Sequence, residues 1–347
     1  MSNLDPDEKI SWLSATIGAT PHPPYSLIAG IGADDCAVLD VAGRSILVVT
    51  SDYVNARPII LTLAIGSYFE IGRYLVNSNL ADLCGSGADP VAVLTSIMWD
   101  RAQPEADFEQ LMQGAKVAAT DAHVAIVGGD TKLSSRAAYC AVGIGTAQTR
   151  SHLFLKGQTR PGDGVWVSGN IGSCAAAVYG WDQLSSDPVW RRWAREAVAN
   201  PTLPLVLARE ASALAMDAGG TDLSDGLGAD LVSLCDVSKV GVEVTADAIP
   251  FHPQVSVLSA QLGVPPYAFA FTVGGDLQFI LCASDRYSAR LEALGLARIG
   301  TIHPDPAHRK LVGVNGALTD LPAVGHRDAH AMTFRDEVGY LLRLQGY

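Results

Sequence analysis

Residues 218–231 read AGGTDLSDGLGADL and place Asp222, Asp225 and Asp230 among glycines. Glycine lets a ligand approach the main chain closely, and residues 228–235 predict the opening of a helix, whose N-terminal N–H groups favour an anion. Carboxylates beside such a backbone are typical of a site where a divalent cation lies between carboxylate and phosphate. The alternative is a solvated acidic turn in which one of these side chains caps the helix. This stretch alone leaves both interpretations open.

The composition of the whole chain limits what its partners can be. With 347 residues and 48% hydrophobic side chains, the chain is long enough for two domains with real cores. A net charge of −12 argues against a nucleic-acid partner, which needs a basic face. No apolar run reaches the length that spans a bilayer, so no membrane partner is expected. The N-terminal residues are acidic and polar, unlike a signal peptide, and we expect a cytoplasmic protein.

The six cysteines lie tens of residues apart and form no C-x-x-C pair. A structural zinc site usually needs ligands that are paired in this way, so we expect none. Most of the cysteines have apolar neighbours, which predicts free thiols in the core of a protein from a reducing compartment.

Two polar segments adjoin apolar strands in the first part of the chain. Residues 30–40, GIGADDCAVLD, place two aspartates on a glycine turn that enters an apolar strand. A second β-run, residues 45–52, carries Ser51 and Asp52 to its C-terminal end. Ligand-binding groups commonly lie at such strand ends in α/β folds.

The next hundred residues alternate between helix and strand patterns. Residues 69–83 predict a helix on which Asn79 and Asp82, three positions apart, share one face. The further predicted elements are a strand at 91–99, a helix at 108–122, a buried strand at 124–132 ending in Gly128-Gly129-Asp130, and a last strand at 137–148. This alternation predicts an N-terminal α/β domain over residues 1–148.

The pattern restarts in a second domain, residues 149–347. In residues 164–180 a strand meets a glycine turn before a helix of small residues, which suits either a phosphate or close strand–helix packing. Residues 181–198 predict a helical excursion with core aromatics, and residues 271–282, FTVGGDLQFILC, lead another glycine turn into a strand.

Each acidic residue alone is more typical of a cap or a turn, but several of them adjoin apolar strands or glycine turns. Burying such carboxylates is costly without a cation. Carboxylates without histidine or cysteine ligands suit Mg²⁺ better than zinc. No G-x-x-x-x-G-K-[ST] phosphate loop, H-R-D or D-F-G kinase motif, or G-x-S-x-G elbow occurs. A nucleotide would therefore be held in some other way.

The motifs follow one another in the order GIGADDCAVLD, VTSD, NSNLADLCGSGADP, VAIVGGDT, RPGDGVWVSGNIG and TDLSDGLGADL. In this order they resemble thiamine-monophosphate kinase. More broadly they resemble the ATP-dependent superfamily of aminoimidazole ribonucleotide synthetase, hydrogenase-maturation protein HypE and selenophosphate synthetase. The resemblance spans residues 30–230 and implies a two-domain α/β (α+β) fold with ATP in the cleft between the domains. It also implies a homodimer whose N-terminal sheets pair into a shared barrel.

The resemblance assigns roles to individual residues. Mg²⁺ on the ATP phosphates would be held by Asp34, Ser51, Asp52, Asp82, Asp130 and Asp222, with Asp225 on a further metal near the transferred phosphoryl group. The nucleotide would be contacted by Gly129, Ser224, Asn79 and Lys156, the last through a phosphate. Asp130, Asp222 and Asp225 become the catalytic candidates, because phosphoryl transfer needs mainly positioning and charge neutralisation. The inserted Ala33 leaves open whether Asp34 or Asp35 is the ligand.

The acceptor half departs from the kinase pattern. Arg57 replaces a histidine, residues 274–279 read GGDLQF in place of GGEDYE, and the tail motif is only loosely kept at residues 325–334. We predict acceptor contacts from Arg57, Asp276 and His326. Such exchanges change specificity more readily than reaction class.

Three hypotheses follow. The first is a Mg²⁺- and ATP-dependent kinase acting on thiamine phosphate or a related small acceptor. The second keeps the fold but uses ATP to activate an amide or carboxylate oxygen, as in the aminoimidazole ribonucleotide synthetase branch. The third is a nucleotide-binding subunit without turnover.

Overall fold

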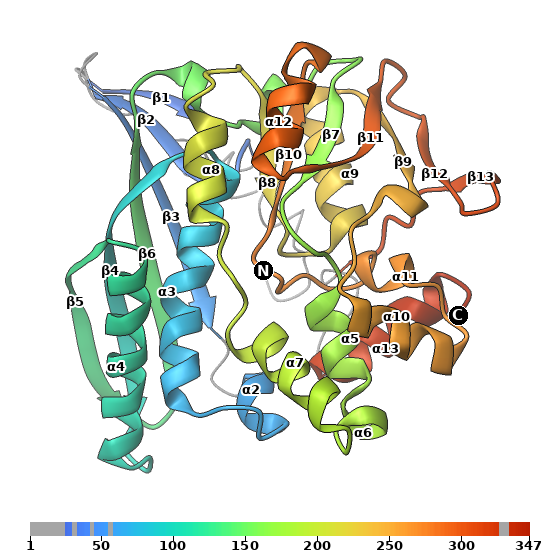
Figure 1. The fold of residues 1–347 in the computed structure, drawn as a ribbon. Helices are drawn as coiled ribbons and strands as arrows, with labels where there is room; N and C mark the ends of the chain where they lie inside the picture. Colours follow the sequence, from blue (N-terminus) through green and yellow to red (C-terminus); the bar gives the residue numbers. More distant parts are fainter. Residues whose placement is uncertain (1–24, 30–32, 42–44, 55–57, 326–332) are drawn as a thin grey trace, which may run out of the picture.

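The computed structural model describes residues 25–29, 33–41, 45–54, 58–325 and 333–347. Two β-sheets follow each other along the chain, the first at the left and the second at the upper right of Figure 1. The strands of the first sheet are β1 (Tyr25–Ala29), β2 (Ala37–Val41), β3 (Ile46–Val54), β4 (Asp89–Asp100), β5 (Ala125–Ser134) and β6 (Ala138–Ala147). Their order in space is β1-β2-β3-β6-β4-β5, and only β4 and β5 run parallel.

The second sheet has the order β13-β12-β9-β11-β7-β10-β8. Its strands are β7 (Gly164–Val167), β8 (Gly219–Asp222), β9 (Gly241–Thr245), β10 (Phe279–Ala283), β11 (Ala297–His303), β12 (Arg309–Val312) and β13 (Leu318–Asp320). Both β7 and β8 are antiparallel to β10. The C-terminal ends of β7 and β8 therefore lie beside the segment that precedes β10, at the same end of the strands.

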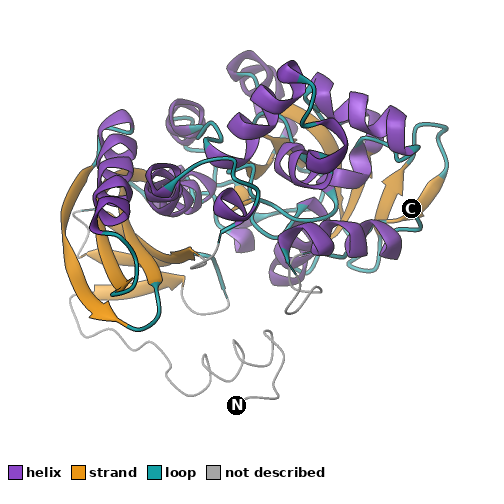
Figure 2. Cartoon of the chain, turned by 90° about the horizontal axis from the view of Figure 1, so that it is seen from below, coloured by secondary structure: helices purple, strands orange, loops and turns teal. Residues whose placement is uncertain are grey.

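Helices cover both sheets and fill the space between them. The helices are α2 (Ile59–Thr62), α3 (Tyr68–Gly85), α4 (Glu105–Asp121), α5 (Ser173–Tyr179), α6 (Trp181–Leu184), α7 (Pro188–Ala199), α8 (Leu205–Ser212), α9 (Leu227–Ser238), α10 (Pro253–Leu262), α11 (Tyr267–Ala270), α12 (Ser288–Leu294) and α13 (Phe334–Leu344), with a 3₁₀ turn, η2, at Lys156–Gln158. Seen from below, the first sheet curves around its helices at one end of the molecule (Figure 2).

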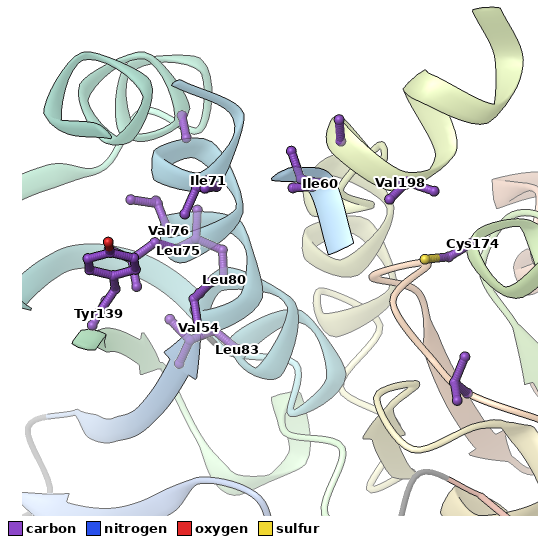
Figure 3. Packing of buried hydrophobic residues seen from close by; sticks show 14 of the residues in the cluster. Val54, Ile60, Ile71, Leu75, Val76, Leu80, Leu83, Tyr139, Cys174 and Val198 are labelled. Carbon is purple, nitrogen blue, oxygen red and sulfur yellow. The ribbon is translucent and has the colours of Figure 1, made fainter. Parts of the chain in front are cut away.

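The helix α3 is the element that both sheets share. Ser67 caps its N-terminus by accepting a hydrogen bond from Phe69 N (3.2 Å), and Glu70 accepts one from Ser67 N (2.7 Å). Apolar side chains of α3, among them Leu75 and Leu80, pack on the first sheet (Figure 3). Its last residues contact β8 of the second sheet.

Most elements expected from the sequence are confirmed, but β5 is not as predicted. The strand is exposed along most of its length, lies at the sheet edge, and continues past Asp130 to Ser134. The reason is that β6 enters the sheet between β3 and β4 and leaves β5 outside. Within the described residues the first sheet is open and forms no closed barrel. The amphipathic pattern of residues 10–17 predicts a short helix, and this segment lies outside the described residues.

All six cysteines are free, and all but Cys140 are buried, as expected. In the part of the chain that the structure describes, no helix has the length and apolar character needed to cross a membrane.

The close approach of α3 and α4 gives a test of the packing. A Cβ atom at Gly114 would lie 1.8 Å from Phe69 O, so Gly114→Ala must push the helices apart. We expect a loss of about 2 kcal/mol in the free energy of unfolding, measured with urea. The matched control is Gly128→Ala, whose Cβ would lie 3.9 Å from Leu94 Cδ2 and should cost little. Equal stability of the two variants would contradict this packing.

Candidate functional site

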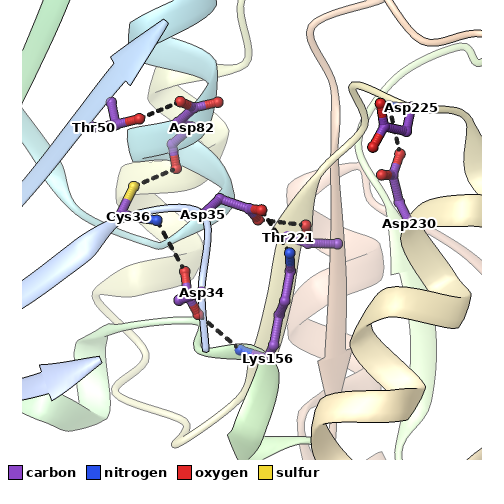
Figure 4. Close-up of polar contacts among 9 residues, drawn as sticks. All are labelled: Asp34, Asp35, Cys36, Thr50, Asp82, Lys156, Thr221, Asp225 and Asp230. Carbon is purple, nitrogen blue, oxygen red and sulfur yellow. Dashed lines mark hydrogen bonds and ion pairs between the residues drawn. The ribbon is translucent and has the colours of Figure 1, made fainter. Parts of the chain in front are cut away.

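Aspartates from separate segments come together between the two sheets (Figure 4). They interact electrostatically with one another, and we call them the carboxylate cluster: Asp34 and Asp35 from the turn before β2, Asp52 from β3, Asp82 from α3 and Asp222 from β8. Because the segments belong to both sheets, the cluster depends on how the two halves pack.

Asp34 and Asp35 are neighbours but have different partners. Asp34 accepts hydrogen bonds from the backbone N–H groups of Lys156 (3.1 Å) and Cys36 (3.4 Å). Asp35 Oδ1 pairs with Lys156 Nζ at 2.6 Å, and its Oδ2 accepts from Thr221 Oγ1 at 2.8 Å. Since Lys156 and Thr221 belong to the second half of the chain, these two aspartates join the halves.

Polar partners hold Asp82 and Asp52 between α3 and β3. Thr50 Oγ1 donates a short hydrogen bond to Asp82 Oδ2. The backbone N–H of Asp52 donates to Asn79 Oδ1 at 3.2 Å. Asn79 and Asp82 therefore face the same strand, which confirms the face predicted from their spacing.

The glycine-rich stretch forms the second-sheet side of the site. Asp222 ends β8 and is buried, and the hydroxyl of Ser224 forms a hydrogen bond with it. Asp225 N donates to Asp230 Oδ2 at 3.2 Å in the first turn of α9. The helix predicted to open here is confirmed. It begins directly after Gly226, whose φ of 106° suits glycine.

Burial raises the pKa values of Asp34, Asp82 and Asp222. It raises the pKa of Asp34 to about 6 and the pKa of Asp222 to about 7, with the charge of Asp35 adding to both. The pKa of Asp82 lies well above its usual range, because of burial first and then the charges of Asp222 and Asp52. The cluster is thus short of positive charge, and a bound cation would favour the ionised carboxylates.

The donor set of the cluster suits a hard divalent cation. Among the described residues, no three His, Cys, Asp or Glu side chains are already close enough together to hold a metal ion. Mg²⁺ is usually bound by one or two carboxylates and completed by water and phosphate oxygens, so it does not require such a cage. Oxygen-only donors that are buried and mutually repelling therefore fit Mg²⁺ bound together with a nucleotide.

Two predicted ligands are not brought to the cluster. Asp130 is exposed on the edge strand β5, where it pairs with Lys132 at 3.1 Å. Ser51 points to the outer face of β3, because side chains alternate along a strand. Arg57 and His326, predicted to contact the acceptor, lie outside the described residues.

Gly129 and Asp276 have evident structural tasks. Gly129 has a φ of 147°, and a Cβ there would lie 1.9 Å from Thr95 O, so β4 and β5 could not approach as they do. Asp276 belongs to the segment before β10 and is buried against the start of α5. It accepts hydrogen bonds from the backbone N–H groups of Gly172 (2.6 Å) and Cys174 (2.8 Å). Burial raises its pKa to about 6.

Sequence reasoning missed Thr50, Thr221 and Tyr74. The two threonines lie in strands and donate to cluster aspartates, which no local motif indicates. Tyr74 lies eight positions before Asp82 on α3, and this spacing places it on the same helix face. Burial raises the pKa of Tyr74 well above its usual range, and the nearby Cys174 and carboxylates add to the effect.

The raised pKa values predict how metal-free stability depends on pH. In the folded chain the pKa of Asp34 is raised to about 6 and the pKa of Asp222 to about 7, from an ordinary value of 3.8. The folded chain then binds more protons than the unfolded chain between these values, so the free energy of unfolding should fall as pH rises through this window. Urea unfolding in a chelator measures this slope, which Asp222→Asn should flatten. An unchanged slope in the variant would contradict the burial of this charge.

Comparisons with known proteins show which families and folds this chain resembles. Residues 33–147 match the family model for AIR synthase related protein, N-terminal domain. The thiamine-monophosphate kinase of Caulobacter vibrioides is 28% identical over 256 residues, which cover 73% of this chain and 70% of the relative. The carbamoyl dehydratase HypE of Cupriavidus necator is 28% identical over 255 residues, which cover 69% of this chain and 69% of the relative.

Solved structures share the whole fold. A structure titled "AaThiL complexed with AMPPCP and TMP" matches with a TM-score of 0.75 and 19% identity, covering 94% of this chain and 97% of that one. HypE in complex with ATP matches with a TM-score of 0.63 and 19% identity, covering 83% and 87%. The resemblance carried by the sequence motifs is thereby confirmed: residues 33–147 match the family of AIR synthase related proteins, and most of the chain is similar to thiamine-monophosphate kinases and to HypE.

Proposed function

We propose that this protein is a Mg²⁺- and ATP-dependent phosphotransferase that transfers the γ-phosphoryl group to thiamine phosphate or a related small acceptor. The observation that carries the proposal is the carboxylate cluster, gathered from both sheets around Lys156. The chain also resembles thiamine-monophosphate kinases over most of its length. We place the domain boundary between residues 148 and 149, where the first sheet ends and the second begins along the chain.

Asp34, Asp52, Asp82 and Asp222 would hold Mg²⁺, which supplies charge neutralisation for the phosphates. Asp225 would hold a further ion nearby. Lys156 would reach a phosphate oxygen from η2. The remaining task of the chain is to position the reactants, because phosphoryl transfer needs little other chemistry from side chains.

The edge of the second sheet that carries Asp222 offers room for an acceptor. A hollow of about 790 Å³ adjoins this edge and is lined in part by Gly169, Ser173 and Asp276. Trp193 and His252 stack at 5.2 Å between ring centroids and form an aromatic wall of the same hollow. A planar heterocycle the size of a cofactor precursor would suit this volume and wall.

The amide-activating chemistry remains the second candidate. Its support is the similarity to carbamoyl dehydratases, together with the altered residues of the acceptor half. Gln278, in the GGDLQF segment, is buried and donates to Thr202 O and Asp276 O. It therefore holds the loop together and presents no carboxylate to an acceptor.

The assay that separates these candidates is ³¹P NMR of the protein with Mg-ATP and thiamine phosphate. We expect a diphosphate ester to appear with matching ADP. Free phosphate without a phosphorylated acceptor would support the amide-activating branch, and ATP binding without any turnover would support a non-catalytic subunit. Asp222→Asn and Asp82→Asn should lower turnover by about 100-fold or more with the fold intact. The matched control, Asp320→Asn on the exposed β13, should keep it.

We also propose a homodimer formed through the outer face of the first sheet. The strand registers place Asp130 opposite Ser96, Ser96 opposite Cys140, and Cys140 opposite Tyr53, so these residues form one row across the sheet. Tyr53 and Met98 are exposed on this face, where large apolar side chains suit an interface. Asp130 would then act on a site completed by the partner subunit.

Complementation tests this placement of Asp130. Homodimers of Asp130→Asn and of Asp222→Asn should each be inactive, because each site lacks one ligand. A co-expressed mixed dimer has one intact site if Asp130 serves the partner's cluster, so random assembly should restore about a quarter of wild-type turnover. No recovery in a purified mixed dimer would exclude this role in the partner's site.

A further inference from the structure

Lys156 brings a positive charge into the carboxylate cluster. Its ammonium lies 2.6 Å from Asp35 Oδ1, and its side chain is only 7% exposed. Burial alone would lower the pKa of Lys156, but Asp35, Asp222 and Asp34 together raise it above its ordinary value. A contact of 2.6 Å between an ammonium nitrogen and a carboxylate oxygen is the geometry of an ion pair, and within the described residues Lys156 is the cation that lies in the cluster.

The position of Lys156 is fixed from several sides. Its backbone N–H donates to Asp34 Oδ2 at 3.1 Å, and its carbonyl accepts a short hydrogen bond from Ser238 Oγ of α9. Thr221 Oγ1 holds the other oxygen of Asp35 at 2.8 Å. Lys156 is thus fixed through its backbone, through its ion pair with Asp35, and through the hydrogen bond from Thr221 to Asp35. Its ammonium group is therefore an ordered part of the site.

The two neighbouring aspartates differ in how their oxygens are used. Both oxygens of Asp35 are engaged by side chains, one by Lys156 and one by Thr221. Both oxygens of Asp34 accept only backbone N–H groups among the contacts in the described part of the chain. Within the described residues Asp34 thus has no ion-pair partner, whereas Asp35 is paired with Lys156.

We propose that Lys156 is the resident counter-ion of the cluster and that Asp35 is a positioning residue that holds it there. The pair stabilises the fold when no divalent cation is bound, and the ammonium opposes the binding of one by Coulomb repulsion. The second part rests on the proposed function, because it takes the cluster as a divalent-cation site. Of the two neighbouring aspartates, Asp34 is then the one that binds the cation.

Removing the ammonium should have two opposite effects. Lys156→Met leaves Asp35 and its neighbours without their counter-charge, so the melting temperature in a chelator should fall by roughly 5 °C or more. In the absence of nucleotide, the affinity for Mn²⁺, followed by electron paramagnetic resonance, should rise on the order of tenfold. Mg²⁺ alone should restore the melting temperature. Lys156→Arg keeps the charge and should resemble the wild type in both measurements.

A double-mutant comparison tests the role of Asp35. Asp35→Asn should lower the melting temperature of the wild type, because it removes the partner of a buried cation. In the Lys156→Met background the same change should raise it, because it removes a carboxylate that has lost its counter-charge beside Asp34 and Asp222. If Asp35 were instead a metal ligand, Asp35→Asn would abolish Mn²⁺ binding in that background.

The matched control is Lys310→Met. Lys310 pairs with Asp320 at the same 2.6 Å, but Asp320 is 89% exposed, so neither measurement should change. A Lys156→Met protein with wild-type melting temperature in chelator and wild-type Mn²⁺ affinity would overturn the proposal. Absence of Mn²⁺ binding in every variant, both without nucleotide and with a non-hydrolysable ATP analogue, would refute the metal part of the proposed function, and the melting temperatures alone would then decide the counter-ion role.

Discussion

The constraint on which this structure depends is the repulsion among buried carboxylates. Aspartates from a turn, two strands and a helix lie near one another, and among the described residues Lys156 is the buried ammonium beside them. Isolated buried charges are costly, so every neighbouring polar group is used to reduce the cost. Thr50 in β3 and Thr221 in β8 donate hydrogen bonds to cluster aspartates, and Asn79 in α3 accepts one from the backbone N–H of Asp52. Such an arrangement favours a ligand that brings positive charge with it.

The helix α3 is what allows two sheets to share this site. Its apolar side chains pack on the first sheet, and Asn79 and Asp82 face β3 of the same sheet. At its end, a Cβ atom on Gly85 would lie 2.4 Å from Asp222 N, so the helix backbone and β8 touch directly. The cluster geometry is therefore set by a backbone contact, which is stiffer than a contact between flexible side chains.

The sequence predicted the parts of the site that follow from local periodicity. The shared face of Asn79 and Asp82 and the turn before α9 were predictable because helical spacing and glycine patterns are short-range signals. The pairing of Asp35 with Lys156 was not, since the two are 121 residues apart. The exposure of Asp130 was not predicted from the sequence, for a similar reason. Its motif resembles a buried strand end, but whether β5 is buried depends on where β6 enters the sheet.

That entry of β6 has a consequence for how the chain acquires its structure during synthesis. The inner strand β3 pairs with β6 in a register that joins Ile46 to Ala147, so its partner is made about a hundred residues later. Until then β3 has only β2 beside it and its other edge is open, and open edges invite wrong pairing. Contacts between residues this distant also form slowly. The first half of the nascent chain thus commits to its fold only after β6 has left the ribosome, and this interval is where it most needs protection from aggregation.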